Sequence, residues 1–426
     1  MTWAAALLLV LLPATAIASE PLDPTFGSDG LAVTKANGNG EINAVTEDRE
    51  GRLVTAGTTE AGFIVQRFGA DGSLDPTFGV TKTSFFRGDY VFANAIAVLP
   101  NGKILVAGQE WTPNTVARYI VTRYLPDGGL DRSFGKGGTV FAGPKMYDGE
   151  AAALAVQPDG RFLIAGWAAD THFGFSGIAM RFKADGALDL SFSRNGYARI
   201  VGGEGAFLQD IAIQPNGSIV VAGEMFDRFM MLRMLPNGRS DPSFGKAGFA
   251  ISNVAPQRGE PASPTGLALL SGGRILLSGN IEGRGRNYVA LARYRRDGRP
   301  DRSFGEGGVV RTRSSRNLTT EAMAVRRDGR ITLAGYRAPQ NAHAQVAVLR
   351  YLPSGRSDPS FGEGGLFAPH LAYESAATSL LTLPDGRTIV AGRSNPSRAL
   401  IHEGPGEEFT SSVLEKGEFL LMRLLR

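Results

Sequence analysis

The sequence predicts an all-β fold: a seven-bladed β-propeller of four-stranded antiparallel blades, with the ring closed by the N-terminal strand completing the C-terminal blade. Three observations predict it. Three motifs recur seven times in a fixed order, the segments between them are short strands separated by hairpin turns, and the repeat length suits one blade. Periods of this size are typical of propellers and related repeat arrays.

The first motif is a turn whose variants include "LDPTFG", "LDRSFG" and "SDPSFG". Its phenylalanines stand 52 to 60 residues apart, at Phe26, Phe78, Phe134, Phe192, Phe244, Phe304 and Phe361. A unit of this length holds four short strands, whereas a one-turn β-solenoid has a much shorter period. The period therefore favours a propeller.

The second motif is an aliphatic strand ending in Ala-Gly or Ser-Gly, with its glycines at Gly57, Gly108, Gly166, Gly223, Gly279, Gly335 and Gly392. The third is an apolar strand with one arginine, as in "YIVTRYLPDG". Such segments between Asp-Gly or Asn-Gly turns are strands joined by hairpins. The chain beyond its first twenty residues has no long stretch with the 3.6-residue period of a helix, which argues against an α/β fold or a helical solenoid.

The two ends of the sequence predict how the ring closes. The last unit has a first strand near Leu380, a second at 387–392 and a third at 418–426, but no fourth. The segment "LDPTFGSDGLAVT", which starts at Leu22, has the pattern of a fourth strand. We expect it to complete the last blade, because a closed ring leaves no unpaired sheet edge.

Together the three motifs resemble the repeats of the bacterial delta-60 repeat proteins, which look like "LDxSFGxxG", "AxAVQPDGKILVAG" and "xxLARYxxDG". The resemblance covers Leu22 to Arg426, and the repeat is more loosely similar to NHL-type propeller blades. Departures are local: Ser193 replaces a glycine, and the first unit lacks the proline of its turn. The resemblance implies a propeller-like fold and an exported protein, and it implies no reaction.

The first residues predict export. An apolar run of about 14 residues is shorter than the ~20 that span a bilayer, and it is followed by Pro13 and the small-residue pattern Ala16-Ile17-Ala18. We expect a signal peptide at 1–18, cleaved near Ala18, and a single β-propeller domain at 19–426. The chain has no cysteine, so disulfides and thiolate metal sites are excluded, and a secreted or periplasmic bacterial protein fits this best.

Loop lengths predict which side of the ring binds a ligand. From the arginine of the third motif to the next marker phenylalanine there are 11 residues in all six complete units, whereas the segment from the second-motif glycine to that arginine spans 10 to 31. Variable loops on a rigid scaffold carry function, although they also simply tolerate insertion. The ligand-binding candidates on that side are Trp111, Trp167, His172, Arg284, Arg286, Tyr336 and His343.

Motifs of common enzyme and metal sites are missing from the sequence. Its four histidines lie outside the repeated strands, and it has no "HExxH", "GxSxG" or P-loop spacing. The "DGxLD" segments lack the ligand set of an EF-hand loop, and their Asp-Gly pairs suit hairpin turns. We therefore expect no catalytic residues, no metal and no cofactor, although a propeller enzyme assembled from several blades would show no linear motif.

The leading functional hypothesis is a secreted or periplasmic, non-catalytic recognition or scaffold propeller that binds a protein or glycan through the variable loops of one face. The alternatives are a channel-centred hydrolase or lyase and a structural or adhesive surface module. Residues 284–330 hold 13 arginines against five acidic residues, which predicts a basic sector for an anionic glycan or an acidic protein, unless these arginines only decorate solvated loops. We expect no nucleic acid, no membrane span in the mature chain, and a monomer.

The hairpin turns predict seven ion pairs. A three-residue turn centred on Asp127 places Arg123 opposite Asp131. The same spacing pairs Arg67 with Asp75, Arg181 with Asp189, Arg233 with Asp241, Arg293 with Asp301, and Arg350 with Asp358. Arg423 has no aspartate eight residues later, so ring closure predicts Asp23 as its partner. The alternative is that each aspartate only organises its own turn.

Overall fold

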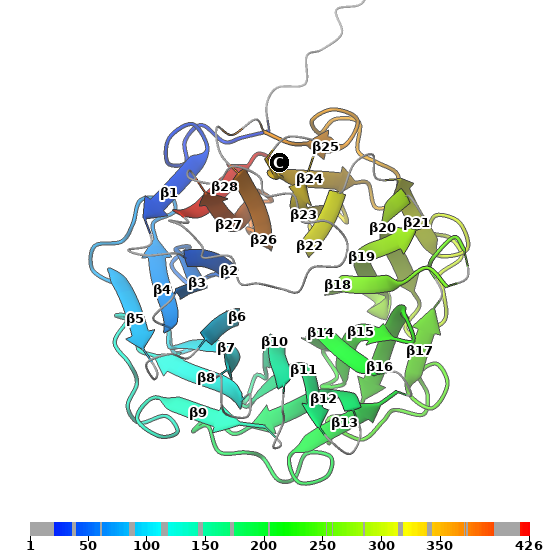
Figure 1. The fold of residues 1–426 in the computed structure, drawn as a ribbon, viewed down its shortest axis with the longest axis horizontal. Helices are drawn as coiled ribbons and strands as arrows, with labels where there is room; N and C mark the ends of the chain where they lie inside the picture. Colours follow the sequence, from blue (N-terminus) through cyan, green and yellow to red (C-terminus); the bar gives the residue numbers. More distant parts are fainter. Residues whose placement is uncertain are drawn as a thin grey trace, which may run out of the picture.

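Seven four-stranded antiparallel sheets stand around a common axis (Figure 1), which confirms the predicted seven-bladed propeller. The computed structural model describes residues 21–426 except 36–39, 60–61, 85–89, 112–117, 144–147, 171–173, 203–204, 253, 258, 284–285, 314–317, 339–342, 370, 372–373 and 396–417. In each blade the first strand lies nearest the axis and the fourth lies at the rim (Figure 1).

The first three blades follow the chain in order. Blade 1 holds β2 (Gly40–Glu47), β3 (Leu53–Thr59), β4 (Gly62–Phe68) and β5 (Val80–Ser84). Blade 2 holds β6 (Tyr90–Val98), β7 (Ile104–Trp111), β8 (Arg118–Tyr124) and β9 (Thr139–Ala142). Blade 3 holds β10 (Asp148–Val156), β11 (Phe162–Asp170), β12 (Gly174–Phe182) and β13 (Tyr197–Val201).

The next three blades repeat this order. Blade 4 holds β14 (Ala206–Ile213), β15 (Ile219–Met225), β16 (Arg228–Met234) and β17 (Phe249–Ser252). Blade 5 holds β18 (Ala262–Leu269), β19 (Ile275–Gly283), β20 (Arg286–Tyr294) and β21 (Val309–Arg313), with a short 3-10 turn, η1 (Ser271–Gly273). Blade 6 holds β22 (Leu318–Val325), β23 (Ile331–Arg337), β24 (Gln345–Tyr351) and β25 (Leu366–Phe367).

Blade 7 joins the two ends of the chain, as the sequence predicts. It holds β26 (Glu374–Thr382), β27 (Thr388–Asn395), β28 (Glu418–Leu424) and, as its fourth strand, β1 (Leu31–Lys35). β1 runs antiparallel to β28 with Leu31 opposite Met422. The backbone N–H of Asp23 donates to the carbonyl of Arg423 at 2.8 Å, which extends the pairing beyond the strand.

The up-and-down order of the strands gives the ring two different faces. The hairpins from first to second strand and from third to fourth strand lie on one side, which we call the turn face. The connections from second to third strand and from one blade to the next lie on the other side, which we call the loop face.

A β-bulge in the first strand of every blade explains the repeated glycine of the second motif. In blade 3 the pairing of β10 with β11 shifts between Ala151 and Ala153, opposite Gly166 and Ala165. The bulge brings the carbonyl oxygen of Glu150 to within 1.8 Å of where a Cβ on Gly166 would stand. Only glycine leaves room for that oxygen, and the six equivalent glycines meet a first-strand carbonyl in the same way.

The hydrophobic core consists of layers between neighbouring blades. One layer packs Leu163 of blade 3 against Leu208 of blade 4, and another packs Ile64 of blade 1 against Ile389 of blade 7. The marker phenylalanines are buried in these layers. Each of the first six, counted from Phe26, lies beneath the turn glycine of the next blade, as Phe26 does beneath Gly72.

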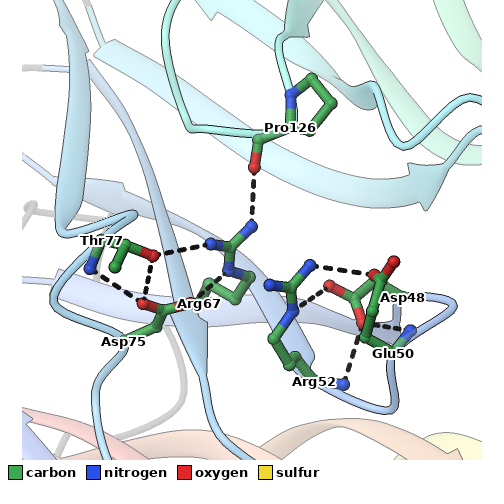
Figure 2. A network of polar contacts seen from close by, with 7 residues as sticks. All are labelled: Asp48, Glu50, Arg52, Arg67, Asp75, Thr77 and Pro126. Atoms are coloured by element: carbon green, nitrogen blue, oxygen red, sulfur yellow. Dashed lines mark hydrogen bonds and ion pairs between the residues drawn. The ribbon is translucent and has the colours of Figure 1, made fainter.

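The repeated arginine joins each blade to the next, and Figure 2 shows this joint in blade 1. Arg67 Nε contacts Asp75 Oδ2 at 2.7 Å, and Arg67 Nη1 donates to the carbonyl of Pro126 in blade 2 at 2.6 Å. The guanidinium carbon also lies 4.7 Å from the centre of the Phe78 ring. Planar, multidentate contacts of this kind suit arginine rather than lysine.

The same ion pair is present in all seven blades at the predicted positions, with Nε to Oδ2 distances of 2.7 to 2.9 Å. In the closing blade, Arg423 Nε lies 2.8 Å from Asp23 Oδ2. Each aspartate also accepts from its own turn, as Asp23 Oδ1 does from the N–H and hydroxyl of Thr25. The ion pair and the turn role, which the sequence offered as alternatives, therefore coexist.

Among the described residues, Arg350 is the exception in its inter-blade contact. The other six arginines donate Nη1 to a backbone carbonyl in the third-to-fourth-strand turn of the next blade, as Arg423 does to Ala70. The blade after Arg350 is blade 7, whose fourth strand comes from the N-terminal segment and not through a hairpin. That turn carbonyl is therefore missing at this one joint.

Candidate recognition site on the loop face

One position of the repeat differs in all seven blades. It directly follows the repeated glycine and lies one to three residues before the second strand ends. The residues there, which we call the variable ring, are Thr58, Gln109, Trp167, Glu224, Asn280, Tyr336 and Arg393. All seven are half-buried, although the residues just before them in each strand are buried. The scaffold is thus constant up to this position and variable at it.

Most variable-ring side chains contact the next blade. Thr58 Oγ1 accepts from the backbone N–H of Ala93 in blade 2 at 3.1 Å. Asn280 makes three hydrogen bonds with Thr320 of blade 6, donating to its carbonyl at 2.9 Å and accepting from its N–H at 3.0 Å and its hydroxyl at 3.1 Å. These contacts hold the side chains in place around the axis, close to the loop face.

An aromatic sector occupies blades 3 and 4. The rings of Trp167, Phe175 and Phe207 have centroids 5.2 to 5.7 Å apart, and Phe175 is 43% exposed. Trp167 Nε1 donates to Glu150 Oε2 at 3.3 Å, and Glu150 Oε1 accepts from the amide of Asn94 at 3.1 Å. Burial raises the pKa of Glu150, with a smaller contribution from Asp148. Apolar ring surface and hydrogen-bonding groups therefore stand side by side.

A charged sector occupies blades 6, 7 and 1. Arg393 Nη1 lies 2.6 Å from Glu41 Oε2, across the blade 7 to blade 1 joint. Glu321 is the extra residue of the blade 6 bulge, and it is exposed to solvent although the protein around its carboxyl removes part of that group's hydration. This partial loss of water and the charge of Glu41 raise its pKa, and the charge of Arg393 opposes the rise.

Glu224 of blade 4 is a further acidic member of the variable ring and bonds to blade 5, which lies between the two sectors. It accepts a hydrogen bond from the hydroxyl of Ser263 in blade 5. Burial raises its pKa, and the charges of Asp227 and Glu282 add to the rise. Acidic groups therefore outnumber Arg393 around the variable ring, which makes this part of the loop face unfavourable for an anionic ligand.

The structure places only some of the predicted ligand-binding residues in this site. Trp167 and Tyr336 are members of the variable ring. His343 is half-buried in the blade 6 connection, and its Nδ1 has no hydrogen-bond partner among the described residues. Trp111 and Arg286 lie at strand ends, and their side chains are outside the described residues, as are His172 and Arg284.

The loop-length argument and the variable ring indicate the same face, which stays a prediction as a binding face, but loop length did not single out most of the ring. Thr58, Gln109, Glu224 and Asn280 were not predicted, because the sequence argument selected aromatic, His and Arg residues near the variable loops, whereas Arg393 entered it only as the start of the long insertion. The signal that finds them is present in the sequence: seven different residues follow an almost constant "AG". No three His, Asp or Glu side chains group as metal ligands within the described part of the chain.

Comparison with known proteins supports a propeller repeat family. The model of the family described as "Domain of unknown function (DUF5122) beta-propeller" matches residues 51–78, 99–134, 157–192, 214–244 and 326–361. Each match ends at a marker phenylalanine. The more specific delta-60 resemblance stays a prediction. No protein of curated function matches the sequence.

Several solved structures resemble this chain at low sequence identity and with TM-scores below 0.5. Virginiamycin B lyase from Staphylococcus aureus, in a catalytically inactive form with quinupristin, is 9% identical, with 92% of this chain and 99% of that chain covered and a TM-score of 0.47. The polysaccharide lyase Uly1 is 10% identical, with 91% and 90% covered and a TM-score of 0.44. A protein of unknown function from Bacteroides caccae is 14% identical, with 63% and 90% covered and a TM-score of 0.37. Likeness at this level says nothing about reaction or ligand.

No helix in the described part of the chain is long and apolar enough to cross a membrane.

Proposed function

We propose that the protein is a secreted or periplasmic recognition propeller that binds its partner through the variable ring and the loops around it, without catalysis. One observation carries the proposal: seven different half-buried side chains occupy a single position of an otherwise repeated scaffold. Structural positions of a repeat stay constant, whereas positions that select a partner need individual side chains. Loops on the same face would add to the contact surface.

The aromatic sector favours a neutral glycan as the partner over an anionic glycan or a protein. The exposed ring of Phe175 offers an apolar surface, and the carboxylate of Glu150, held by the Asn94 amide, offers acceptor oxygens near it. Aromatic anchors surrounded by a few polar groups are typical of specific binding surfaces. The carboxylates around the ring would repel an anionic glycan at this face.

A glycan array followed by titration of the full chain tests this proposal. Replacing Trp167 with Ala removes the central ring of the aromatic sector, and we expect the affinity for the captured glycan to fall by about tenfold or more. The matched control is Leu190→Ala, because Leu190 is 68% exposed and lies in a first-motif turn on the turn face. Equal affinity of the Trp167→Ala variant and the parent for every captured glycan would contradict the proposal.

A hydrolase or lyase is the second candidate, favoured by the raised pKa of Glu321 beside the Arg393–Glu41 pair. A carboxyl with a raised pKa is a candidate general acid. If the site is catalytic, Glu321→Gln abolishes turnover of the captured glycan while binding persists. If it only recognises the glycan, parent and variant both leave it intact.

A further inference from the structure

A basic pocket opens on the turn face between blades 5 and 6, on the side of the ring opposite the variable ring. It has a volume of about 510 Å³. Arg274, Arg293, Arg326 and Arg327 line it, and none of its lining residues is acidic. The sequence of each wall differs from the equivalent turns of the other blades. Each difference removes an acidic residue or adds an arginine.

The blade 5 wall has lost the acid that normally holds its arginine. The equivalent turns read "QPDGR" in blade 3 and "LPDGR" in blade 7, where Arg161 and Arg387 bind the turn aspartate at 2.7 and 2.6 Å. Both also reach the aspartate of the first motif, at 3.5 and 2.9 Å. Blade 5 reads "LSGGR", so Gly272 stands where the turn aspartate would be.

Arg274 is consequently left without a counter-charge. It bonds only the carbonyl and hydroxyl of Ser271, at 3.2 and 3.4 Å. Within the described part of the chain no carboxylate lies within 4.0 Å of it, although Asp301 is its equivalent first-motif partner. Its guanidinium therefore remains able to bind an anion.

The blade 6 wall has gained positive charge. Its turn reads "RRDG" where blades 2, 3, 4 and 7 have Leu or Gln followed by proline. Arg326 pairs with Asp328 through Nη2 at 3.2 Å, but its Nε is buried and has no hydrogen-bond partner among the described residues. Arg327 is exposed and has no ion pair with any described residue. At the neighbouring turn, Ser354 replaces the aspartate found in four of the other blades.

The pocket also contains Arg293 and two apolar side chains. Arg293 is already committed, to Asp301 through Nε and to the carbonyl of Pro353 through Nη1, so it contributes charge but few free donors. Leu276 and Ile331 supply an apolar floor. The pocket therefore combines two unpaired guanidinium groups with a surface on which a small organic body can rest.

We propose that this pocket binds a phosphate or sulfate ester of a sugar. Arg274 and Arg327 hold the tetrahedral oxyanion, since guanidinium groups donate paired hydrogen bonds to such groups. The sugar ring lies on the apolar floor, and Arg326, whose guanidinium lies against Gly386 of blade 7, adds positive charge but no donor. The basic sector that the sequence predicts thus resolves into one built site, separate from the variable ring.

Isothermal titration of the full chain at low salt tests the proposal with glucose 6-phosphate, a sulfated heparin disaccharide, glucose and inorganic phosphate. We expect one of the two esters to bind with one site per chain and a Kd below about 1 mM. Glucose should not bind, and inorganic phosphate should bind at least about tenfold more weakly, because it does not use the apolar floor. Failure of both esters to bind, or equal binding of inorganic phosphate, overturns the proposal.

Two variants separate the pocket from general surface charge. Arg274→Ala combined with Arg327→Ala should weaken ester binding about tenfold or more, since it removes both unpaired guanidinium groups. Ser354→Asp restores the aspartate that four of the other blades have at this turn, and it should weaken binding similarly while keeping every arginine. The control, Arg132→Ala with Arg239→Ala, removes two exposed arginines outside the pocket and should change the affinity less than about twofold. If the control weakens binding as much as the pocket variants do, the proposal is wrong.

Discussion

Replacing Asp23 with Ala tests whether the N-terminal segment holds the ring closed. Asp23 accepts four hydrogen bonds, from the N–H and hydroxyl of Thr25, from Arg387 and from Arg423. The side chains of Asp23 and Arg423 are only 5% and 4% exposed. The substitution therefore leaves a buried guanidinium without its counter-charge.

We expect the unfolding free energy at pH 7 to fall by about 3 kcal/mol. Removing one partner of a buried ion pair costs about 3–5 kcal/mol. The low end applies here because Arg423 keeps the hydroxyl of Thr25 at 2.7 Å and the ring of Phe26 at 4.8 Å. Urea denaturation of the full chain measures the loss.

The unfolding free energy lost in the Asp23→Ala variant should be smaller at low pH than at pH 7. Burial of Asp23 acts to raise its pKa, but the hydrogen bonds from Thr25, Arg387 and Arg423 outweigh it and hold the pKa well below the usual value. A lowered carboxyl pKa stabilises the fold above the unfolded-state value of about 3.9, and that stabilisation disappears as the pH falls. The difference between parent and variant should therefore shrink below about pH 4.

Asp189→Ala is the matched control, because it breaks the same pair with Arg181 in an internal blade. Its outer strand β13 stays tethered at both ends, whereas β1 in the Asp23→Ala variant is free to leave β28. Hydrogen exchange should show that β1 loses more amide protection in the Asp23→Ala variant than β13 loses in the Asp189→Ala variant. An unfolding free energy within about 1 kcal/mol of the parent, or unchanged protection of β1, would refute the reasoning.

Three further outcomes follow from the structure. Gly166→Ala should lower the unfolding free energy by about 3 kcal/mol in urea denaturation, because its Cβ would stand 1.8 Å from a carbonyl oxygen. Its control is Gly79→Ala, which has open space around the new Cβ but a φ of +66, and which should lower the unfolding free energy by only about 1 kcal/mol. Burial raises the pKa of Asp210 to about 6, so stability should rise as the pH falls from 7 to 5, and Asp210→Ala should flatten that rise. Mass spectrometry of the exported protein should find Ser19 as its first residue, and an intact Met1 in the membrane fraction would contradict the signal peptide.

The repeat made the fold predictable, because residues that join blades must recur. Arg67, Asp75 and Phe78 belong to one joint, and their sevenfold recurrence revealed both the blade number and the strand order. Their hairpin symmetry extended even to the Arg423–Asp23 pair, 400 positions apart.

The bulge and the candidate sites were harder to predict. Gly166 is constant because a carbonyl oxygen approaches it, and a backbone approach leaves no residue pattern on the opposing strand. Trp167 was predicted because tryptophan is typical of binding surfaces. Gln109 and Asn280 are not residue types that mark a site, and the sequence around them is that of an ordinary strand.

The anion pocket was harder to predict for a different reason. The sequence shows the basic region and the Gly272 that replaces a turn aspartate, but only the packing of blades 5 and 6 shows that Arg274 and Arg327 line one pocket.

The pairing of β1 with β28 also sets an order of assembly. During translation β1 is made long before β28, so Leu31–Lys35 lacks its strand partner until residue 424 has emerged. Unpaired strand edges are sites of aggregation, and closing so long a loop slows folding. A chain that stops before β28 leaves β1 without its partner and the seventh blade incomplete. We therefore expect truncation within the last blade to destabilise the whole ring and not that blade alone.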